Sequence, residues 1–133
     1  MNYVESRCTK KRKWRKRICI QCDGGIFMCG IAGWLDNGAN LQEKEETMDK
    51  MLRTMGRRGP DDTGKYVQKN VCLLHSRLVV VDPEMGRQPM SMRAPGIDST
   101  IVYNGELYNT EQVRDELKEL GYDFNGHSDT EVV

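Results

Sequence analysis

The stretch Cys-Gly-Ile-Ala-Gly-Trp-Leu at residues 29–35 is the part of the sequence that most constrains the fold. It is a short apolar run that ends at the turn signal Asp-Asn-Gly of residues 36–38, and this pattern predicts a strand buried on both faces. Asn40 then stands in a capping position. Residues 41–55 carry Met and Leu at helical spacing, which predicts an amphipathic helix whose apolar side chains enter the core.

The middle of the chain predicts more strands around a long connection. Residues 65–68 and 71–81 form a predicted hairpin, and residues 99–103 form a further strand that ends at an Asn-Gly pair. Residues 82–95 contain three prolines and are expected to be irregular. A loop of this length in a compact domain is more often functional than idle.

The C-terminal part predicts one helix and the beginning of another. Residues 122–124 are typical of a short strand, and Ser128 is typical of the cap of a helix that has barely begun at Val133. We therefore expect the domain to continue beyond residue 133. The earlier helix runs from Thr110 and stops at Gly121. Its expected apolar face consists of Val113, Leu117 and Leu120.

Charge is unevenly distributed along the chain. The 20 basic and 20 acidic side chains give a formal net charge of zero. Residues 1–27 nevertheless hold eight Lys or Arg and two acids, which leaves twelve basic and eighteen acidic side chains in residues 28–133. Such asymmetry indicates a boundary. We therefore divide the chain into a basic leader, residues 1–27, and the front part of a globular domain, residues 28–133.

The basic leader lacks helical and strand periodicity and admits three interpretations. It is a propeptide that is cleaved, a nucleic-acid or nuclear-targeting patch, or untranslated sequence that precedes the true first residue, Met28. The third is favoured, because residues 23–28 can be encoded with a GGAGG string shortly before an ATG, which is how a bacterial ribosome-binding site would look if translated. Codons for Gly24 and Gly25 other than GGA-GG would remove that argument.

Several classes of protein are disfavoured. No stretch reaches the ~18 apolar residues of a membrane span, and the basic leader lacks the apolar core of a secretory signal. The expected location is the cytoplasm, where disulfides are rare, so the five cysteines are interpreted as thiols. Cys19 and Cys22 have the spacing of half a zinc site, but no second pair completes it, and no metal site is expected.

Cys29 is the candidate nucleophile. Residues 28–34, Met-Cys-Gly-Ile-Ala-Gly-Trp, resemble the mature start of class II glutamine amidotransferases, in which the initiator Met or a short propeptide is removed. In that family the α-amine of the N-terminal Cys serves as the base for its own thiol. A thiol with a pKa of ~8.5 is mostly protonated at neutral pH, and an α-amine with a pKa of ~7.7–8.0 can accept its proton. Taken alone, the motif also fits a buried strand cysteine.

Residues 58–61, Arg-Gly-Pro-Asp, resemble the corresponding loop of asparagine-synthase-type glutaminase domains. Relatives commonly have His where this chain has Arg57. Arg58 and Asp61 are expected to organise the loop and not to react.

Residues 75–78, His-Ser-Arg-Leu, resemble the strand of that family whose Arg binds the carboxylate of glutamine. The resemblance assigns this role to Arg77, since a guanidinium is a natural bidentate partner for a carboxylate. The alternative for Arg77 is a surface cation. His75 is given a structural role, because this mechanism takes its base from the α-amine.

Residues 104–109, Asn-Gly-Glu-Leu-Tyr-Asn, carry the most specific resemblance, to the signature of asparagine synthases. It assigns the oxyanion hole to the side-chain N–H of Asn104 and the backbone N–H of Gly105, and such donors contribute roughly 2.7–4 kcal/mol each. Glu106 would accept the α-ammonium group of glutamine. The alternative is an ordinary Asn-Gly hairpin turn.

Residues 128–131, Ser-Asp-Thr-Glu, complete the set. They resemble the family's Ser-Asp-x-Glu, in which the Asp, here Asp129, is a second partner for the ammonium group; the alternative is a plain helix N-cap. The segments follow the family's order from Met28 to Val133. Relatives that make glucosamine phosphate or phosphoribosylamine do not usually carry both the 58–61 and the 104–109 motifs, so the resemblance favours asparagine synthases.

This resemblance implies an α+β fold, a partial αββα sandwich with two antiparallel sheets between helical layers. It implies hydrolysis of glutamine to glutamate and ammonia, which a C-terminal synthetase domain would use for ATP-dependent amidation of aspartate. No cofactor is expected in residues 1–133, because ATP and Mg²⁺ belong to that synthetase domain. The expected partners are glutamine and the synthetase domain, with a homodimer left open. Neither a membrane nor a nucleic acid is an expected partner.

Two alternatives remain open. Domains with the same front end serve other acyl acceptors, or the chain is an inactive remnant whose basic leader binds nucleic acid. Residues 1–133 alone are expected to be inactive, since missing strands would leave sheet edges unpaired. Soluble expression with a cooperative melt would count against a remnant. Salt-dependent DNA binding that is lost in residues 28–133 would support a nucleic-acid binder.

Overall fold

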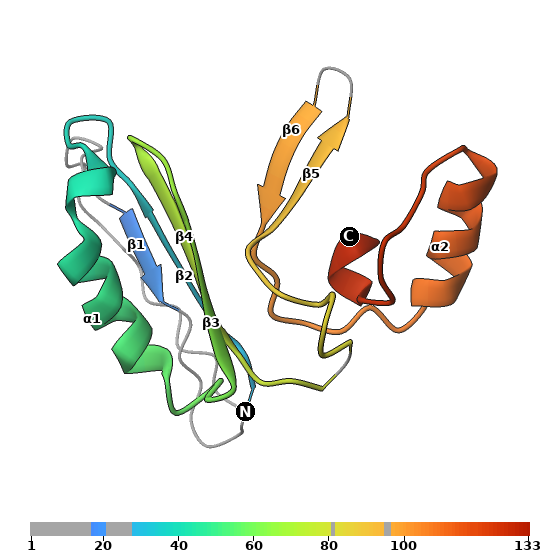
Figure 1. Ribbon diagram of the computed structural model, residues 1–133, viewed down its shortest axis with the longest axis horizontal. Helices are drawn as coiled ribbons and strands as arrows, with labels where there is room; N and C mark the ends of the chain where they lie inside the picture. Colours follow the sequence, from blue (N-terminus) through green and yellow to red (C-terminus); the bar gives the residue numbers. More distant parts are fainter. Residues whose placement is uncertain (1–16, 21–27, 81, 95–96) are drawn as a thin grey trace, which may run out of the picture.

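The computed structural model describes residues 17–20, 28–80, 82–94 and 97–133. Figure 1 shows α1, a first sheet, a second sheet and α2 one after another across the view. Among the described residues, no helix has the length and apolar character needed to cross a membrane. The elements, in chain order, are β1 (Arg17–Ile20), β2 (Gly30–Leu35), the 3₁₀ helix η1 (Leu41–Glu43), α1 (Glu45–Met55), β3 (Asp62–Val67), β4 (Val71–Arg77), β5 (Met90–Ala94), β6 (Ile97–Ile101), α2 (Thr110–Glu119) and the 3₁₀ helix η2 (Asp129–Glu131).

Two antiparallel sheets and two α-helices make this an α+β fold, as predicted. The first sheet has the order β1-β2-β4-β3, and the second consists of β5 and β6. Strand β2 pairs with β4 from Gly30 opposite Ser76 to Leu35 opposite Val71. The expectation that β2 is buried on both faces was too strong. Its face toward α1 is buried, whereas its other face is half-buried and Leu35 is 52% exposed.

Helix α1 covers one face of the first sheet, as the apolar spacing of residues 41–55 predicted. The α-helix begins later than expected, at Glu45, because the 3₁₀ helix η1 precedes it. Asn40 caps η1, since its side chain accepts a hydrogen bond from the backbone N–H of Gln42 and donates to Glu43. The core between helix and sheet consists of Ala32, Trp34, Leu41, Met48, Met51, Leu52, Met55, Cys72 and Leu74.

The predicted hairpin is present as β3 and β4, but β4 is shorter than expected. Its pairing ends at Arg77, because the next residue, Leu78, leaves the sheet and contacts the sulfur of Cys29. Strand β5 was missed, since it lies inside the segment 82–95 that prolines marked as irregular. It is stabilised by pairing with β6, which lies further along the chain.

The C-terminal part departs from its prediction in two places. Residues 122–124 are not a strand, because no described strand pairs with them. Leu120 is 75% exposed, since it is the C-cap residue of α2 and the chain reverses at once at Gly121, whose φ is +91°. The buried residue of α2 is instead Arg114. Ser128 does cap a helix, the short η2, by accepting from the backbone N–H of Thr130.

The expectation that the basic leader has no regular structure was wrong for residues 17–20. They form β1, an edge strand that pairs with β2 from Arg17 opposite Leu35 to Ile20 opposite Ala32. An edge strand satisfies its backbone through its neighbour, so it needs no apolar alternation of its own. The rest of the basic leader lies outside the described residues, as does Cys22.

Candidate functional site

Cys29 lies directly before β2, and its sulfur contacts the chain just beyond β4. The backbone N–H of Leu78 donates to the sulfur at 3.3 Å, and the thiol lies 3.5 Å from the carbonyl oxygen of the same residue. Cys29 is half-buried, so its sulfur is held without being sealed off. The antiparallel pairing of β2 with β4 brings this cysteine next to the end of the strand that carries Arg77.

The loop 58–61 braces the same region. Arg58 donates through Nε to the carbonyl oxygen of Cys29 at 3.4 Å. Asp61 holds both sides of Leu78: its backbone N–H donates to the carbonyl of Arg77 at 3.0 Å, and its carboxylate accepts from the N–H of Val79 at 2.8 Å. The loop therefore fixes the main chain on both sides of Leu78, the residue that contacts the sulfur of Cys29.

Arg77 is buried, with 5% of its surface exposed, so it is not the surface cation that was its alternative. Its guanidinium donates to the carbonyl oxygens of Asp82 at 2.6 Å and Pro83 at 3.1 Å. These contacts tie the first turn of the loop 82–89 to the end of β4. The predicted bond from Arg77 to a substrate carboxylate stays a prediction.

The other predicted residues gather around Tyr103, beyond β6. The phenol oxygen of Tyr103 would lie 2.7 Å from a Cβ at Gly105, so it packs against that backbone. Burial raises the pKa of Tyr103, and the carboxylates of Asp129 and Glu106 raise it further. The Asp129 carboxylate also accepts from the backbone N–H of Leu107 at 3.2 Å. The structure therefore brings three of the predicted residues, from 105, 106 and 129, to one place.

The predicted site thus consists of two groups on different parts of the fold. Cys29 and Arg77 belong to the first sheet, whereas Asn104, Gly105, Glu106 and Asp129 follow the second sheet. Within the described part of the chain, no hydrogen bond joins Cys29 to residues 104–106. Figure 1 shows the loop that follows β4 connecting the two halves of the molecule.

Asp82 in that loop was not found from the sequence. It has a left-handed backbone, with φ of 47°. Its carboxylate accepts from the backbone N–H groups of His127 at 2.7 Å and Met85 at 2.9 Å, and these bonds lower the pKa of Asp82. Since its carbonyl also accepts from Arg77, Asp82 links the end of β4 to the segment before Asp129. The available signal in the sequence was an aspartate that directly follows the apolar segment 78–81.

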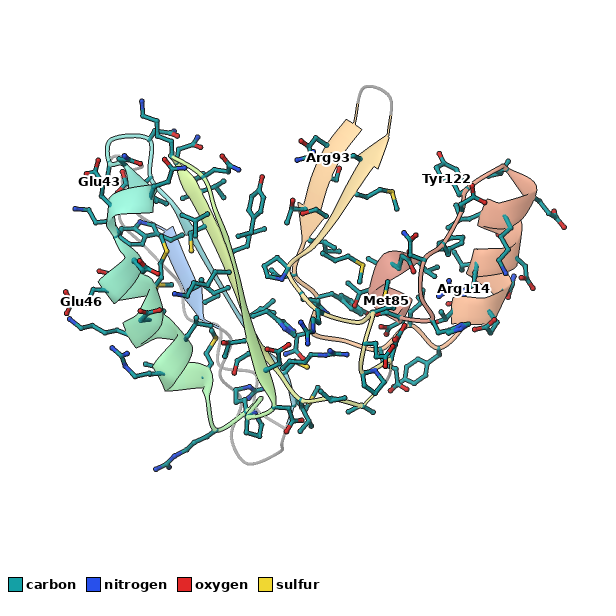
Figure 2. The ribbon with its side chains drawn as sticks, in the orientation of Figure 1. Glu43, Glu46, Met85, Arg93, Arg114 and Tyr122 are labelled. Carbon is teal, nitrogen blue, oxygen red and sulfur yellow. The ribbon has the colours of Figure 1, made fainter. Side chains whose placement is uncertain are left out.

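Arg114 supports that segment from the opposite side. Its guanidinium donates to the carbonyls of Gly126 at 2.9 Å and Ser128 at 3.1 Å, and it lies 4.6 Å from the centre of the Phe124 ring. Figure 2 shows Arg114 on the side of α2 that faces the centre of the molecule. The main chain before Asp129 is therefore held by side chains from both α2 and the loop 82–89.

His75 is buried in β4, with 1% of its surface exposed. Neither ring nitrogen has a hydrogen-bond partner among the described residues. Burial lowers the pKa of His75 to about 4, and the charge of Arg77 acts in the same direction. The imidazole is therefore neutral near pH 7.

Replacing His75 with leucine is expected to flatten the pH dependence of stability between about pH 6.5 and pH 4. The pKa is about 4 in the folded protein and ~6.5 when unfolded, so the unfolded state binds the extra proton as the pH falls. The contribution of neutral His75 to the free energy of unfolding is complete above about pH 6.5. It declines by about 3 kcal/mol towards pH 4. Urea unfolding across this range measures the difference between the two proteins. His127→Leu, at the exposed second histidine, is the control; equal pH slopes for His75→Leu and wild type would contradict the assignment.

No group of three or more His, Cys, Asp or Glu side chains in the described ranges is arranged to hold a metal ion. What the geometry offers instead is a half-buried thiol beside a buried guanidinium, and a separate cluster of two carboxylates around a phenol. A thiol, an Arg fork and paired carboxylates suit covalent attack on an amino-acid substrate.

Comparison with known proteins defines the class. Residues 28–133 match the family model of the glutamine amidotransferase domain, and the chain belongs to this family. Within it, the chain is similar to glutamine-hydrolysing asparagine synthetases. It is 50% identical over 106 residues to asparagine synthetase 3 of Bacillus subtilis. Over the same length it is 37% identical to asparagine synthetase 3 of Arabidopsis thaliana and 35% identical to asparagine synthetase B of Escherichia coli.

Each of these matches covers 80% of this chain but only 17%, 18% and 19% of the respective relative. The chain therefore spans less than a fifth of the length of these relatives. The family and the similarity to a part of asparagine synthetases are established by these matches. The resemblance drawn from residues 28–34, 58–61 and 104–109 is thereby confirmed.

Proposed function

We propose that residues 28–133 form the front part of a glutaminase site that hydrolyses glutamine to glutamate and ammonia. The observation that carries the proposal is the position of Cys29. It is the second residue of the segment that matches the amidotransferase domain family, and its half-buried sulfur lies against Leu78, the neighbour of Arg77.

The chemistry requires a free amine on Cys29. This nitrogen is bonded to Met28 in the chain, so the bond between the two residues must be cleaved, or synthesis must begin at Met28 with removal of that Met. The α-amine of Cys29 then accepts the thiol proton. The thiolate attacks the side-chain carbonyl carbon of glutamine, the carbon–nitrogen bond breaks, and the nitrogen leaves as ammonia with the proton. Water hydrolyses the thioester to glutamate and regenerates the thiol.

The remaining residues bind the substrate and stabilise the oxyanion in this scheme. Arg77 pairs with the substrate carboxylate, while Glu106 and Asp129 accept the α-ammonium group. Asn104 and Gly105 donate to the oxyanion as it forms. The clustering of residues 105, 106 and 129 around Tyr103 supports the shared ammonium and oxyanion assignments.

In the whole protein, we propose that the ammonia is used to amidate aspartate to asparagine. The similarity to proteins named asparagine synthetases supports this acceptor. ATP and Mg²⁺ would bind the synthetase part of such a protein, outside residues 1–133. A homodimer and a cytoplasmic location are part of the same proposal. A relative with another acyl acceptor is the alternative, and the ammonia-consuming step distinguishes the two.

The test is made on the protein isolated from its native cell. Its intact mass and first residue are determined, and the protein is then treated with a glutamine analogue whose amide is replaced by an electrophilic carbon. A chain that begins at Cys29 and takes up one label on that residue is expected. A chain that begins at Met1, with no label and no glutamate formed, would overturn the proposal. The same mass shows how far the protein extends.

A further inference from the structure

Gln88, in the loop 82–89, joins two segments that are distant in the sequence. Its side-chain oxygen Oε1 accepts from the backbone N–H of Tyr103 at 2.6 Å. Its side-chain nitrogen Nε2 donates to the hydroxyl of Thr130 at 2.9 Å. Thr130 is 4% exposed, so this second bond is largely screened from water. One amide group therefore spans both segments and uses its acceptor and its donor in doing so.

Each segment carries part of the proposed glutamine site. Tyr103 directly precedes Asn104 and Gly105, which are assigned to the oxyanion hole. Thr130 directly follows Asp129, which is assigned to the ammonium group. For both contacts to form with one substrate, the distance between the oxyanion donors and the ammonium acceptor must match the length of glutamine. Gln88 joins the two segments that carry these groups.

The main chain of Gln88 is itself fixed to the first sheet. A Cβ built on Gly64 of β3 would lie 1.8 Å from the carbonyl oxygen of Gln88 and 2.8 Å from its carbonyl carbon. Only a glycine at position 64 leaves room for this approach. Gly64 pairs with His75 on β4, the strand that carries Arg77 two residues later. The contact thus continues from Gln88 to the half of the molecule that contains Cys29.

We propose that Gln88 is a positioning residue for the glutaminase reaction, which sets the oxyanion segment 103–105 against Asp129 and holds both against the first sheet. This inference rests on the proposed function and deepens it. Gln88 touches no reacting atom; it acts through Tyr103 and Thr130. A side-chain amide suits the place, because it accepts from Tyr103 and donates to Thr130 at the same time.

The two arms of Gln88 predict separate kinetic effects. Gln88→Met keeps the length but removes both bonds, and is expected to lower kcat by about 10- to 100-fold and to raise KM, as small misplacements of catalytic groups do. Thr130→Val removes only the arm toward Asp129. It is expected to raise KM about 3- to 10-fold with kcat within about twofold, since binding is weakened equally in the ground state and the transition state. Initial rates of glutamate formation by the protein from its native cell, carrying each substitution, give both constants.

Two further variants sharpen the test. Gln88→Glu can accept from both the Tyr103 N–H and the Thr130 hydroxyl, so it is expected to restore most of kcat. Gln112→Met makes the same chemical change on the exposed surface of α2, where Gln112 bonds only Glu116 among described side chains, and it is expected to leave both constants unchanged. If Gln88→Met has the same kcat and KM as Gln112→Met, the inference is overturned.

A readout that does not need turnover separates this inference from the proposed function. Hydrogen exchange of the Tyr103 amide is expected to be about tenfold faster in Gln88→Met than in wild type and to stay slow in Gln88→Glu, because a carboxylate still accepts from that N–H. Unchanged exchange would defeat the Gln88 inference alone. Wild-type protein that forms no glutamate while Tyr103 exchange responds as expected would defeat the proposed function instead.

Discussion

Replacing Cys29 with alanine is expected to lower the rate of glutamate formation by at least about 10³-fold, the largest effect of any substitution in the chain. Without the thiol no thioester forms, and only binding and oxyanion stabilisation remain. The affinity for glutamine should stay within about threefold, since the sulfur is not assigned to substrate binding. Glutamate release and equilibrium binding of glutamine, measured on the same preparation, give the two numbers.

Cys72 provides the matched control. It is fully buried in the core beneath α1, and burial raises its pKa to about 11, so its thiol stays protonated at neutral pH. Cys72→Ala is therefore expected to cost stability but to keep the reaction and the label from the electrophilic analogue. A Cys29→Ala protein that retains more than about a tenth of the activity, far above what loss of a nucleophile leaves, would show that another group attacks the substrate.

Helix α1 and the strands β2, β3 and β4 could be predicted because their signals are local. Met48, Met51, Leu52 and Met55 recur at the helical period, and the structure buries all four. The apolar run at 29–35 and the hairpin at 65–81 likewise depend on patterns within a few residues. Boundaries shifted where a tertiary contact decided them, as at Leu78, which exchanges sheet pairing for the sulfur of Cys29.

Strands β1 and β5 were missed from the sequence, since each is decided by backbone pairing with another strand. β1 lies in the basic leader and is an edge strand on β2. β5 lies close to prolines, and its partner β6 begins at Ile97, shortly after β5 ends at Ala94. In both cases the backbone supplies the stabilising bonds, and backbone pairing leaves little trace in side-chain pattern. The burial of Arg114 could not be predicted either, because arginine is rarely buried without polar partners. Its partners here are backbone carbonyl groups elsewhere in the chain.

The candidate site was predictable by resemblance as a set of residues, but not as an arrangement. Motifs name Cys29, Arg77, Asn104 and Asp129 and give no indication of what holds them in place. Asp82 and Gln88 instead fix the segments around some of these residues, through side-chain bonds to His127, Tyr103 and Thr130. Such bonds have no sequence period, so only their location in an unusually long loop suggested a role.

Replacing Gly59 with alanine is expected to lower the free energy of unfolding by about 3 kcal/mol or more. A Cβ at this position would lie 2.2 Å from the carbonyl oxygen of Ser76 and 2.6 Å from the carbonyl carbon of Arg77. These are backbone atoms inside a paired strand, so they cannot move aside as a side-chain end would. The loop must lift away from β4 instead.

Lifting the loop also removes contacts that brace the nucleophile. Ser76 donates to the carbonyl of Gly59 at 2.7 Å, and the neighbouring Asp61 N–H donates to Arg77. Gly38→Ala is the matched control, because the nearest atom to its Cβ would be 3.6 Å away and its φ is not positive. A drop in Tm of roughly 10 °C or more is expected for Gly59→Ala and little change for Gly38→Ala. Equal melting temperatures for the two variants would mean that the loop does not pack on β4 as closely as the structure places it, and the bracing of Cys29 through Arg58 and Asp61 would fall with it.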